Sequence, residues 1–303
     1  MLDKLDLKII GLLSRDCRIS YRNMASIVNL TPNAAKARVS KMISNGIIKN
    51  FIVSANPALF GYEIECSITI QNIGRKIKEE HIVNKLNLVG DVLVYAKQLG
   101  ESSIYILALK DVAEDRIRIV NDLIKPAVVK KTIFTNYRLP AIKIQISDLK
   151  IIKSLLSNPR MQIEEIARES SLSTRTVARW FERVKKNHFL EFSTIRDMSS
   201  LQLIGYIEFA LIIDVDKKFH QNVIDTISYE MDEYLLFISN IYQDNVIFAV
   251  FFCANIPTLD LILTKLRSYK GVQKIALFIT TRLAFYQDWL KREINKRLSQ
   301  IIR

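Results

Sequence analysis

The sequence predicts an α+β protein in which two winged helix-turn-helix domains alternate with two ferredoxin-like domains. Three observations predict this fold. The chain contains an internal repeat, each copy opens with three amphipathic helix patterns and a β-rich segment, and each copy continues in a strand–helix–strand–strand–helix–strand order. At 303 residues the chain is long enough for several domains.

The internal repeat has an offset of about 142 residues. The run Asp6–Ile10 recurs as Asp148–Ile152, and Leu30 matches Leu172 at the same offset. Near the ends of the two copies, Arg138-Leu139 match Arg282-Leu283 at an offset of 144. Ordered matches along both halves indicate a duplication whose joint lies near residues 144–147.

The first helical triplet spans residues 5–45. Apolar residues recur at helical spacing over residues 5–14, and Ser20 is a good N-cap for a second short helix. Thr31 followed by Pro32 predicts the start of a third helix, which Asn45-Gly46 ends. The β-rich residues 47–53 that follow are typical of a wing. This order is the scaffold that places a third helix in the major groove of DNA.

The second copy repeats this triplet, with its third helix beginning after Ser173. Trp180 stands where the first copy has Arg38, and we interpret it as a core residue. Side chains suited to base edges and phosphates mark the outer side of each third helix. The predicted DNA contacts are Thr31, Asn33, Lys36, Arg38, Ser40, Lys41, Ser173, Thr174, Arg175, Thr176, Arg179 and Arg183. An ordinary solvated helix face is the alternative, and a structural role is open for Arg38.

The predicted domain organisation follows the repeat. The boundaries are residues 1–60 and 147–200 for the two winged helix-turn-helix domains, 61–146 and 201–284 for the two ferredoxin-like effector and oligomerisation domains, and 285–303 for a basic C-terminal helix. We expect this last helix to dock on the last domain, with a membrane surface or DNA as alternatives. A tandem chain can supply both halves of a dimer, so we expect an intramolecular pseudo-dimer.

The formal net charge of +13 is unevenly distributed. Residues 1–60 carry 9 basic and 3 acidic groups, whereas residues 201–284 carry 7 basic and 9 acidic groups. A basic surface attracts phosphate, which favours a nucleic-acid partner, although charge alone does not separate DNA from RNA or an acidic membrane.

The cysteines and histidines are too scattered to form a metal site. Cys17, Cys66 and Cys253 form no close pair, and no histidine stands near them. We therefore expect reduced thiols, no metal and no cofactor. The longest apolar runs are too short for a membrane span, and the N-terminus lacks a signal-peptide pattern, which predicts a cytoplasmic protein without a membrane partner.

The opening of the chain resembles the Lrp/AsnC family of transcriptional regulators. The matching residues are Leu5-Asp6, Ile9-Ile10, Leu13, Asp16, Arg18, Ala25, Leu30, Arg38-Val39 and Gly46-Ile47-Ile48. Family members are usually about half as long and form dimers that assemble further. The resemblance therefore implies a sequence-specific regulator that binds double-stranded DNA, with two fused units, a possible small-molecule effector and homo-oligomers.

The effector corner of the family is only partly kept. Family members often carry Gly-x-x-Asp between the central strands of the second domain, near which amino acids bind. The first copy reads Gly100-Glu101-Ser102-Ser103 and the second reads Tyr242-Gln243-Asp244-Asn245. If an effector binds, the resemblance implies Lys97, Gly100, Glu101 and Ser103 as its site.

Two alternative functions remain. Siroheme decarboxylases resemble this family and occur as fused pairs, but their chemistry needs a proton donor, commonly histidine. The second domains contain only His81 and His220, at positions that do not correspond, so we expect no enzyme. An architectural protein that coats DNA without reading its sequence is the other alternative.

Overall fold

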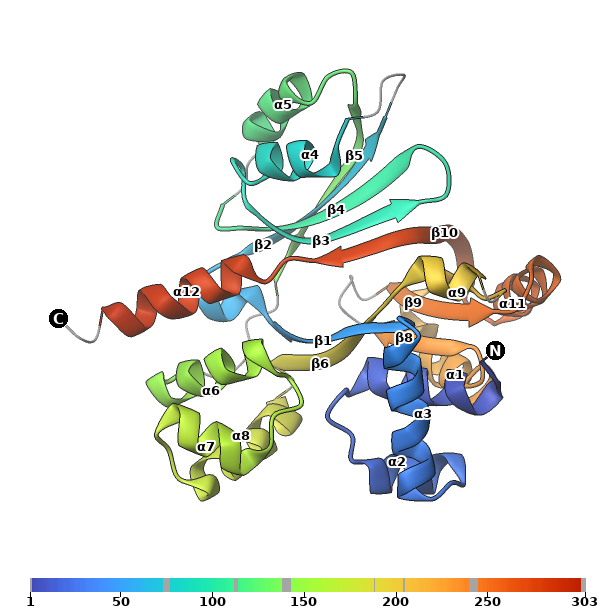
Figure 1. Cartoon of the computed structure of the whole chain (residues 1–303). Helices are drawn as coiled ribbons and strands as arrows, with labels where there is room; N and C mark the ends of the chain where they lie inside the picture. The colour runs from blue at the N-terminus through green and yellow to red at the C-terminus, as the bar shows by residue number, and fades with distance from the viewer. Residues whose placement is uncertain are drawn as a thin grey trace. The chain divides into compact units, whose positions relative to one another are not determined.

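The computed structural model describes residues 2–72, 77–111, 114–137, 143–187, 189–203, 205–239 and 245–300. The chain divides into two compact units: unit 1 contains residues 1–50 and 194–283, and unit 2 contains residues 51–193 and 284–303. Each unit thus joins the helical triplet of one repeat to the sheet domain of the other repeat (Figure 1).

The first triplet belongs to unit 1. Its helices are α1 (Lys4–Arg15), α2 (Tyr21–Val28) and α3 (Pro32–Ser44). Asp3 caps α1, and the side chain of Asp6 accepts a hydrogen bond from the backbone of Asp3 in return, which closes a capping box. Apolar side chains such as Ile9, Ile10 and Met24 are buried, as the amphipathic patterns of the sequence predict.

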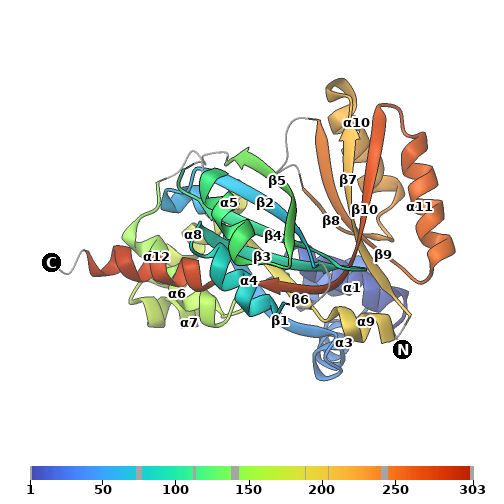
Figure 2. The same ribbon diagram turned by 90° about the horizontal axis from the view of Figure 1, so that it is seen from above.

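The second sheet domain completes unit 1. Its elements are α9 (Met198–Leu203), β7 (Ile207–Val215), a short 3-10 helix (Lys217–Phe219), α10 (His220–Glu230), β8 (Leu235–Ser239), β9 (Val246–Cys253), α11 (Ile256–Ser268) and β10 (Val272–Phe285). The antiparallel order β10-β7-β9-β8 is the ferredoxin-like order. Alternate residues of β7, including Phe209 and Leu211, pack with α10 and α11 on one face (Figure 2).

The first sheet domain belongs to unit 2 and has the same topology. It contains a short 3-10 helix (Pro57–Phe60), β2 (Ile64–Gln71), α4 (Glu79–Leu86), β3 (Asp91–Gln98), β4 (Ser102–Leu109), α5 (Glu114–Leu123) and β5 (Val128–Asn136). The antiparallel order is β5-β2-β4-β3, and α4 and α5 cover one face (Figure 1). The ferredoxin-like prediction is therefore confirmed for both copies.

The second triplet and the C-terminal helix complete unit 2. They are α6 (Ile146–Ser157), α7 (Ile163–Ser170), α8 (Thr174–Asn187) and α12 (Asp288–Ser299). The expectation that the C-terminal helix docks on the last domain is wrong, because α12 packs against α6 and β3. The physical reason is that β10 continues to Phe285 and carries the chain into unit 2, where Trp289 and Leu290 are buried.

Two wing strands carry the chain between the units. β1 (Ile48–Ala55) and β6 (Leu190–Arg196) pair with each other in a two-stranded sheet. In unit 1 the Thr194 hydroxyl donates to the carbonyl oxygen of Asn50 (3.3 Å), and in unit 2 the Asn56 amide donates to the carbonyl oxygen of Phe189 (3.2 Å). The strand expected after each triplet is therefore present.

Neither a membrane span nor a metal cluster is found in the described part of the chain. None of its helices combines the length and apolar character needed to cross a bilayer. The same residues contain no group of three or more possible metal ligands from His, Cys, Asp and Glu.

Candidate nucleic-acid interface

The turn before the third helix is the same in both triplets. The C-cap residues of α2 and α7, Asn29 (φ 54°) and Ser171 (φ 56°), both lie in the left-handed region. The next amide in each copy, Leu30 or Leu172, donates to a carbonyl oxygen of the preceding helix at 2.9 Å. The two third helices therefore begin from the same backbone geometry.

The inner side of each third helix is apolar. α3 buries Ala35, Val39 and Met42, and α8 buries Val177, Trp180 and Val184. Trp180 is only 4% exposed, which confirms its interpretation as a core residue. The polar side of each helix must consequently point away from the triplet core.

Two of the predicted contacts, Thr31 and Ser173, also cap these helices, and a third, Thr176, contacts the second cap. The Thr31 hydroxyl accepts a hydrogen bond from the Ala34 amide at 3.2 Å, and the Ser173 hydroxyl accepts one from the Thr176 amide at 3.1 Å. The hydroxyls of Ser173 and Thr176 lie 2.8 Å apart. All three side chains are exposed, so each hydroxyl lies at the electropositive end of a helix, where an anion such as phosphate is stabilised.

The two arginines Arg38 and Arg183 hold the triplets together. Arg38 Nη1 donates to Asp3 Oδ2 (2.7 Å) and to Asp6 Oδ1 (2.8 Å), while Arg183 pairs with Asp148. Asp6 and Asp148 occupy the same repeat position. The arginines thus join the third helix to the first, which gives them a structural role.

The contacts between Arg38 and the two carboxylates also shift the pKa values of Asp3 and Arg38. Burial alone would raise the pKa of Asp3, but hydrogen bonds from the Asp6 backbone and from Arg38 outweigh it, so the pKa lies below its usual value. Hydrogen bonds to Asp6 and Asp3 raise the pKa of Arg38. The charged forms of both groups are therefore stabilised.

Seven predicted contacts remain exposed and unoccupied by other groups. In the part of the chain that the structure describes, no hydrogen bond or ion pair is found for their side chains, and all seven are exposed. They are Asn33, Lys36, Ser40, Lys41, Thr174, Arg175 and Arg179. Arg175 and Arg179 lie one helical turn apart, so both guanidinium groups project from one face of α8.

The sequence reasoning overlooked the second helices. Arg22 is exposed in the first turn of α2, where a winged helix-turn-helix crosses the DNA backbone. At the corresponding place α7 has Glu164 and Glu165 in its first turn. The signal was available, because Arg22 follows the predicted N-cap Ser20 by two residues. The charge in the first turn of the second helix therefore differs between the two triplets.

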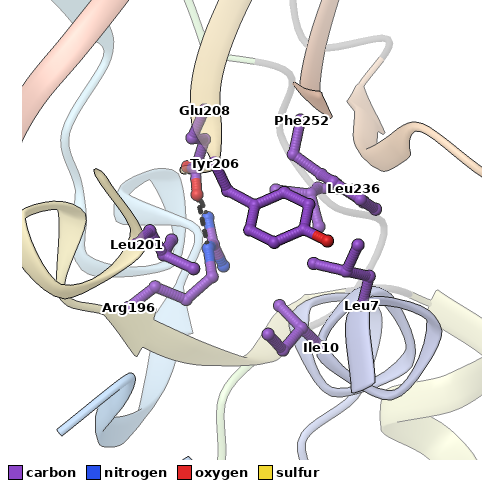
Figure 3. Close-up of a pocket in the computed structure, with 8 residues that line it drawn as sticks. All are labelled: Leu7, Ile10, Arg196, Leu201, Tyr206, Glu208, Leu236 and Phe252. Atoms are coloured by element: carbon purple, nitrogen blue, oxygen red, sulfur yellow. Dashed lines mark hydrogen bonds and ion pairs between the residues drawn. The ribbon is translucent and has the colours of Figure 1, made fainter. Parts of the chain in front are cut away.

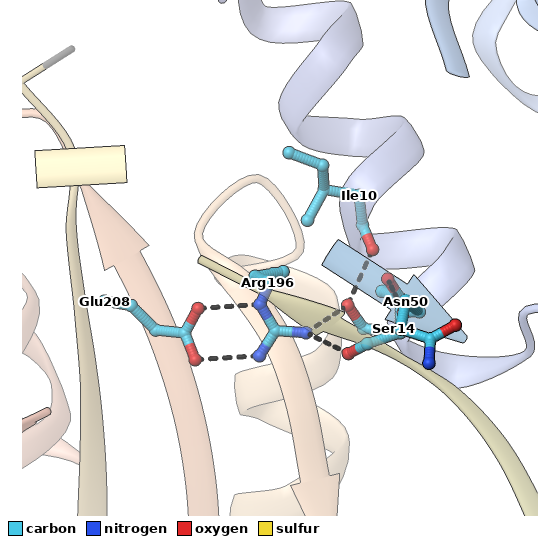
Figure 4. Close-up of polar contacts among 6 residues, drawn as sticks. Ile10, Ser14, Asn50, Arg196 and Glu208 are labelled. Carbon is cyan, nitrogen blue, oxygen red and sulfur yellow. Dashed lines mark hydrogen bonds and ion pairs between the residues drawn. The ribbon is translucent and has the colours of Figure 1, made fainter. Parts of the chain in front are cut away.

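A buried ion pair fixes the first triplet on its sheet domain (Figure 4). Arg196 donates from Nε and Nη2 to the two carboxylate oxygens of Glu208, each at 2.7 Å. Its Nη1 donates to the Ser14 hydroxyl of α1 (2.8 Å), which itself donates to the carbonyl oxygen of Ile10 (2.7 Å). Burial alone would lower the pKa of Arg196, but the charge of Glu208 and its hydrogen bonds raise it.

In unit 2 the corresponding junction contains a helix. α12 packs against both α6 and β3, and the Trp289 ring meets the rings of Phe60 and Tyr62 edge-on at 5.7 and 5.6 Å. The buried Glu293 accepts from the Tyr62 hydroxyl and from Lys110 Nζ, each at 3.4 Å. The second triplet is thus joined to its sheet domain through α12.

The predicted effector corner is a tight hairpin between β3 and β4. Gly100 has φ 93°, and Glu101 is exposed, whereas Ser103 is buried and Lys97 is half-buried. The structure brings these residues together on one turn. Most of the second corner, residues 242–244, lies outside the described residues.

Comparisons with known proteins identify the class. A family model for winged helix-turn-helix DNA-binding domains matches residues 2–49 and 144–190. An uncharacterized HTH-type transcriptional regulator of Pyrococcus abyssi is 36% identical over 133 residues, 44% of this chain and 88% of that protein. The regulatory protein AsnC of Haemophilus influenzae is 30% identical over 130 residues, 40% of this chain and 85% of that protein.

A solved structure extends the likeness to the whole chain. The siroheme decarboxylase NirDL has a TM-score of 0.50 and covers 99% of this chain and 100% of its own, but is 16% identical, which shows a shared fold alone. The chain carries two helix-turn-helix segments and is a DNA-binding protein. It belongs to the Lrp/AsnC family of HTH-type transcriptional regulators and contains the family unit twice.

Proposed function

We propose that this regulator reads specific double-stranded DNA sites with the exposed faces of α3 and α8. The observation that carries the proposal is the seven exposed side chains on the two helices. Arginine and lysine pair with guanine edges, asparagine pairs with adenine, and hydroxyls suit phosphates. Arg175 and Arg179 have no partner among the described side chains, so a DNA contact breaks no ion pair.

Binding to a promoter fragment at several salt concentrations tests this proposal. The variants are Lys36→Ala/Lys41→Ala for α3 and Arg175→Ala/Arg179→Ala for α8. Each pair of substitutions should weaken binding at least about tenfold and lower the salt slope by about 2. The matched control is Lys130→Ala/Lys131→Ala, which removes two exposed charges from β5. Unchanged affinity for both helix variants would overturn the proposal.

A genome-wide occupancy map separates a regulator from an architectural protein. Specific reading should give a limited number of sharp sites, and the helix variants should lose them. Broad, even coverage would instead favour a protein that coats DNA through phosphate contacts.

We further infer that the chain is not an enzyme. The likeness to a decarboxylase supports the shared fold alone. His81 is exposed on α4, and His220 is half-buried at the start of α10, so the two sheet domains offer no matched proton donor at these residues. His188 lies outside the described residues. Decarboxylation of siroheme by the purified protein would contradict this inference.

The remaining inferences concern organisation. We propose the functional domain boundaries 1–60, 61–146, 147–200, 201–284 and 285–303, and a cytoplasmic location as for other regulators. The exchange of sheet domains between the repeats supports an intramolecular pseudo-dimer, and we propose that chains associate further. A small-molecule effector would bind at the hairpin of Lys97, Gly100, Glu101 and Ser103.

A further inference from the structure

The two third helices, α3 and α8, can be compared position by position. Their N-caps are equivalent, because the hydroxyls of Thr31 and Ser173 each accept a hydrogen bond from the backbone amide three residues further on, that of Ala34 or Thr176. Each position of α3 therefore corresponds to the position of α8 that lies 142 residues later. The exposed side chains of the two helices can then be matched one to one.

The N-terminal half of each helix carries two exposed residues that differ between the copies. The second residue after the N-cap is Asn33 in α3 and Arg175 in α8, and all four residues at this place and one turn later are exposed. One turn later stand Ala37 in α3 and Arg179 in α8. Residues four apart share one face of a helix, and this part of the third helix contacts base edges in the helix-turn-helix scaffold. We call each pair of residues a reading pair.

The two reading pairs suit different base pairs. The side-chain amide of Asn33 matches the donor and the acceptor that adenine presents in the major groove, and the methyl group of Ala37 can pack against the methyl group of thymine. The guanidinium groups of Arg175 and Arg179 instead donate two parallel hydrogen bonds, which match the two acceptors of guanine. Since adenine has a donor where guanine has an acceptor, neither reading pair can replace the other.

The positions beside the reading pairs differ as well. Lys36 is exposed on α3, where α8 has the half-buried Ala178. Ser40 of α3 corresponds to Glu182 of α8, whose carboxylate lies 3.5 Å from Lys185 Nζ. A lysine attracts phosphate and a carboxylate repels it. The phosphate contacts of the two helices should therefore differ along with the base contacts.

Each third helix belongs to a triplet that is packed on a sheet domain. In unit 1, Leu7 and Ile10 of α1 face Phe252 of β9, and the space left between them has room for about one water molecule (Figure 3). In unit 2, α12 lies against both α6 and β3. A packed scaffold thus presents each helix, so the base preference depends on the exposed side chains of the helix itself.

We propose that one chain reads an asymmetric DNA site with two unlike half-sites: α3 binds a half-site that contains A·T pairs, and α8 binds a half-site that contains G·C pairs. The proposal rests on the DNA-reading function proposed above and names the bases that each helix selects. A dimer of identical chains presents the same helix twice and reads a palindrome. The duplicated chain presents two helices of different chemistry, so its preferred site is not a palindrome. The specificity-determining residues are Asn33, Ala37, Arg175 and Arg179.

Selection of bound sequences from a pool of random double-stranded DNA by the full chain tests the proposal. The wild type should enrich a motif with two unlike halves, one with A·T pairs and one with G·C pairs at the selected positions. Asn33→Arg/Ala37→Arg gives α3 the reading pair of α8, so the A·T half should become a second G·C half. At the converted base pairs the preference for guanine over adenine should be at least about fivefold. The reverse exchange, Arg175→Asn/Arg179→Ala, should turn the G·C half into a second A·T half.

A matched control adds two arginines at the same spacing outside the triplets. Thr264→Arg/Ser268→Arg changes two exposed residues of α11 and should leave the motif unchanged. All exchanged residues are exposed, so every variant should unfold near the wild-type temperature, which a thermal scan checks. A wild-type motif without two unlike halves, or exchanges that do not interconvert the halves, overturn the asymmetric site but leave the DNA-reading function standing. No enriched motif at all overturns the DNA-reading function, and the asymmetric site with it.

Discussion

Units 1 and 2 join the same kinds of parts by different means. In unit 1 the first helix of the triplet lies directly on β8, and the buried pair Arg196–Glu208 ties the two together. In unit 2 α12 lies against both α6 and β3 and supplies Trp289 and Glu293 to the junction. Duplication thus left two copies of one interface. A buried ion pair stabilises the copy in unit 1, and the additional helix α12 stabilises the copy in unit 2.

The two triplets differ in a related way. Arg38 binds two carboxylates, Asp3 and Asp6, whereas Arg183 is seen paired with one, Asp148. The first turn of α2 has no acidic residue, but that of α7 has two. Substitutions at matching positions should therefore have unequal effects in the two copies.

Arg196→Met should have the largest effect. It leaves the buried Glu208 without its counter-charge, which costs about 3–5 kcal/mol of unfolding free energy for such pairs. Protection of α1 amides from hydrogen exchange should fall in unit 1, while α6 in unit 2 keeps its protection. The double variant Arg196→Met/Glu208→Met should recover most of the loss. An equal loss of unfolding free energy in the single and double variants would show that the Arg196–Glu208 pair does not hold α1 on its sheet domain.

Glu65 should make the stability pH-dependent. It stands on β2 where β7 has Glu208, but no ion pair is found for it among the described residues, and burial raises its pKa from 4.5 to about 7. The folded state then holds the Glu65 proton more tightly than the unfolded state. The stabilisation that this proton contributes is therefore fully present below about pH 4.5 and is lost as pH rises to about 7.

This change is worth up to about 3 kcal/mol, at 1.36 kcal/mol per unit of pKa. Urea unfolding at pH 5 and pH 7.5 measures it, and Glu65→Gln should flatten the pH dependence. Glu208→Gln serves as the contrast because its carboxylate is paired. A wild-type protein equally stable at both pH values would contradict the expected titration.

Asp148→Asn should cost more than Asp6→Asn. The Asp148 side chain is 2% exposed and is the carboxylate seen bound to Arg183, whereas that of Asp6 is 12% exposed and shares Arg38 with Asp3. We expect about 1–2 kcal/mol for Asp148→Asn and about half of that for Asp6→Asn, from lost helix capping and lost charge pairing. Thermal unfolding of both variants decides this, and the reverse order would refute the argument from shared partners.

Neutralising the two acidic side chains in the first turn of α7 should have the smallest effect. Glu164→Gln/Glu165→Gln lowers repulsion at the phosphates, so DNA affinity should rise about two- to fivefold at low salt and little at high salt. The matched change Arg22→Gln in α2 should weaken binding by a similar factor. Binding curves at two salt concentrations measure both. An affinity that α7 substitution leaves unchanged at low salt would place this helix away from the phosphates.

The fold was predictable where periodicity was strong. The strand–helix–strand–strand–helix–strand order of both sheet domains was predicted, and the triplets followed from apolar spacing and caps such as Thr31. The short helices at Pro57–Phe60 and Met198–Leu203 were missed, because so few residues give no periodic pattern. The extension of β10 to Phe285 was also missed, because alternation of apolar residues does not fix where a strand ends.

The site was predictable only in part. Helical spacing correctly put Arg175 and Arg179 on an outer face, opposite the buried Trp180. It did not distinguish them from Arg183, which is bound to Asp148, because a pair 35 residues apart leaves no local signal. The same holds for Arg196 and Ser14, which are 182 residues apart. Whether Arg175 and Arg179 contact DNA stays a prediction.

Unit 1 is built from two distant parts of the chain, which constrains how it folds during synthesis. Its first 50 residues pack with residues 194–283, so this unit lacks most of its partner surface until nearly the whole chain has left the ribosome. Unit 2 meanwhile receives its last helix, α12, from residues 288–299. Cutting the gene at the joint of the repeat would therefore yield two fragments, each without the sheet domain that its helical triplet packs against. Only co-expression of the two fragments should restore folded protein.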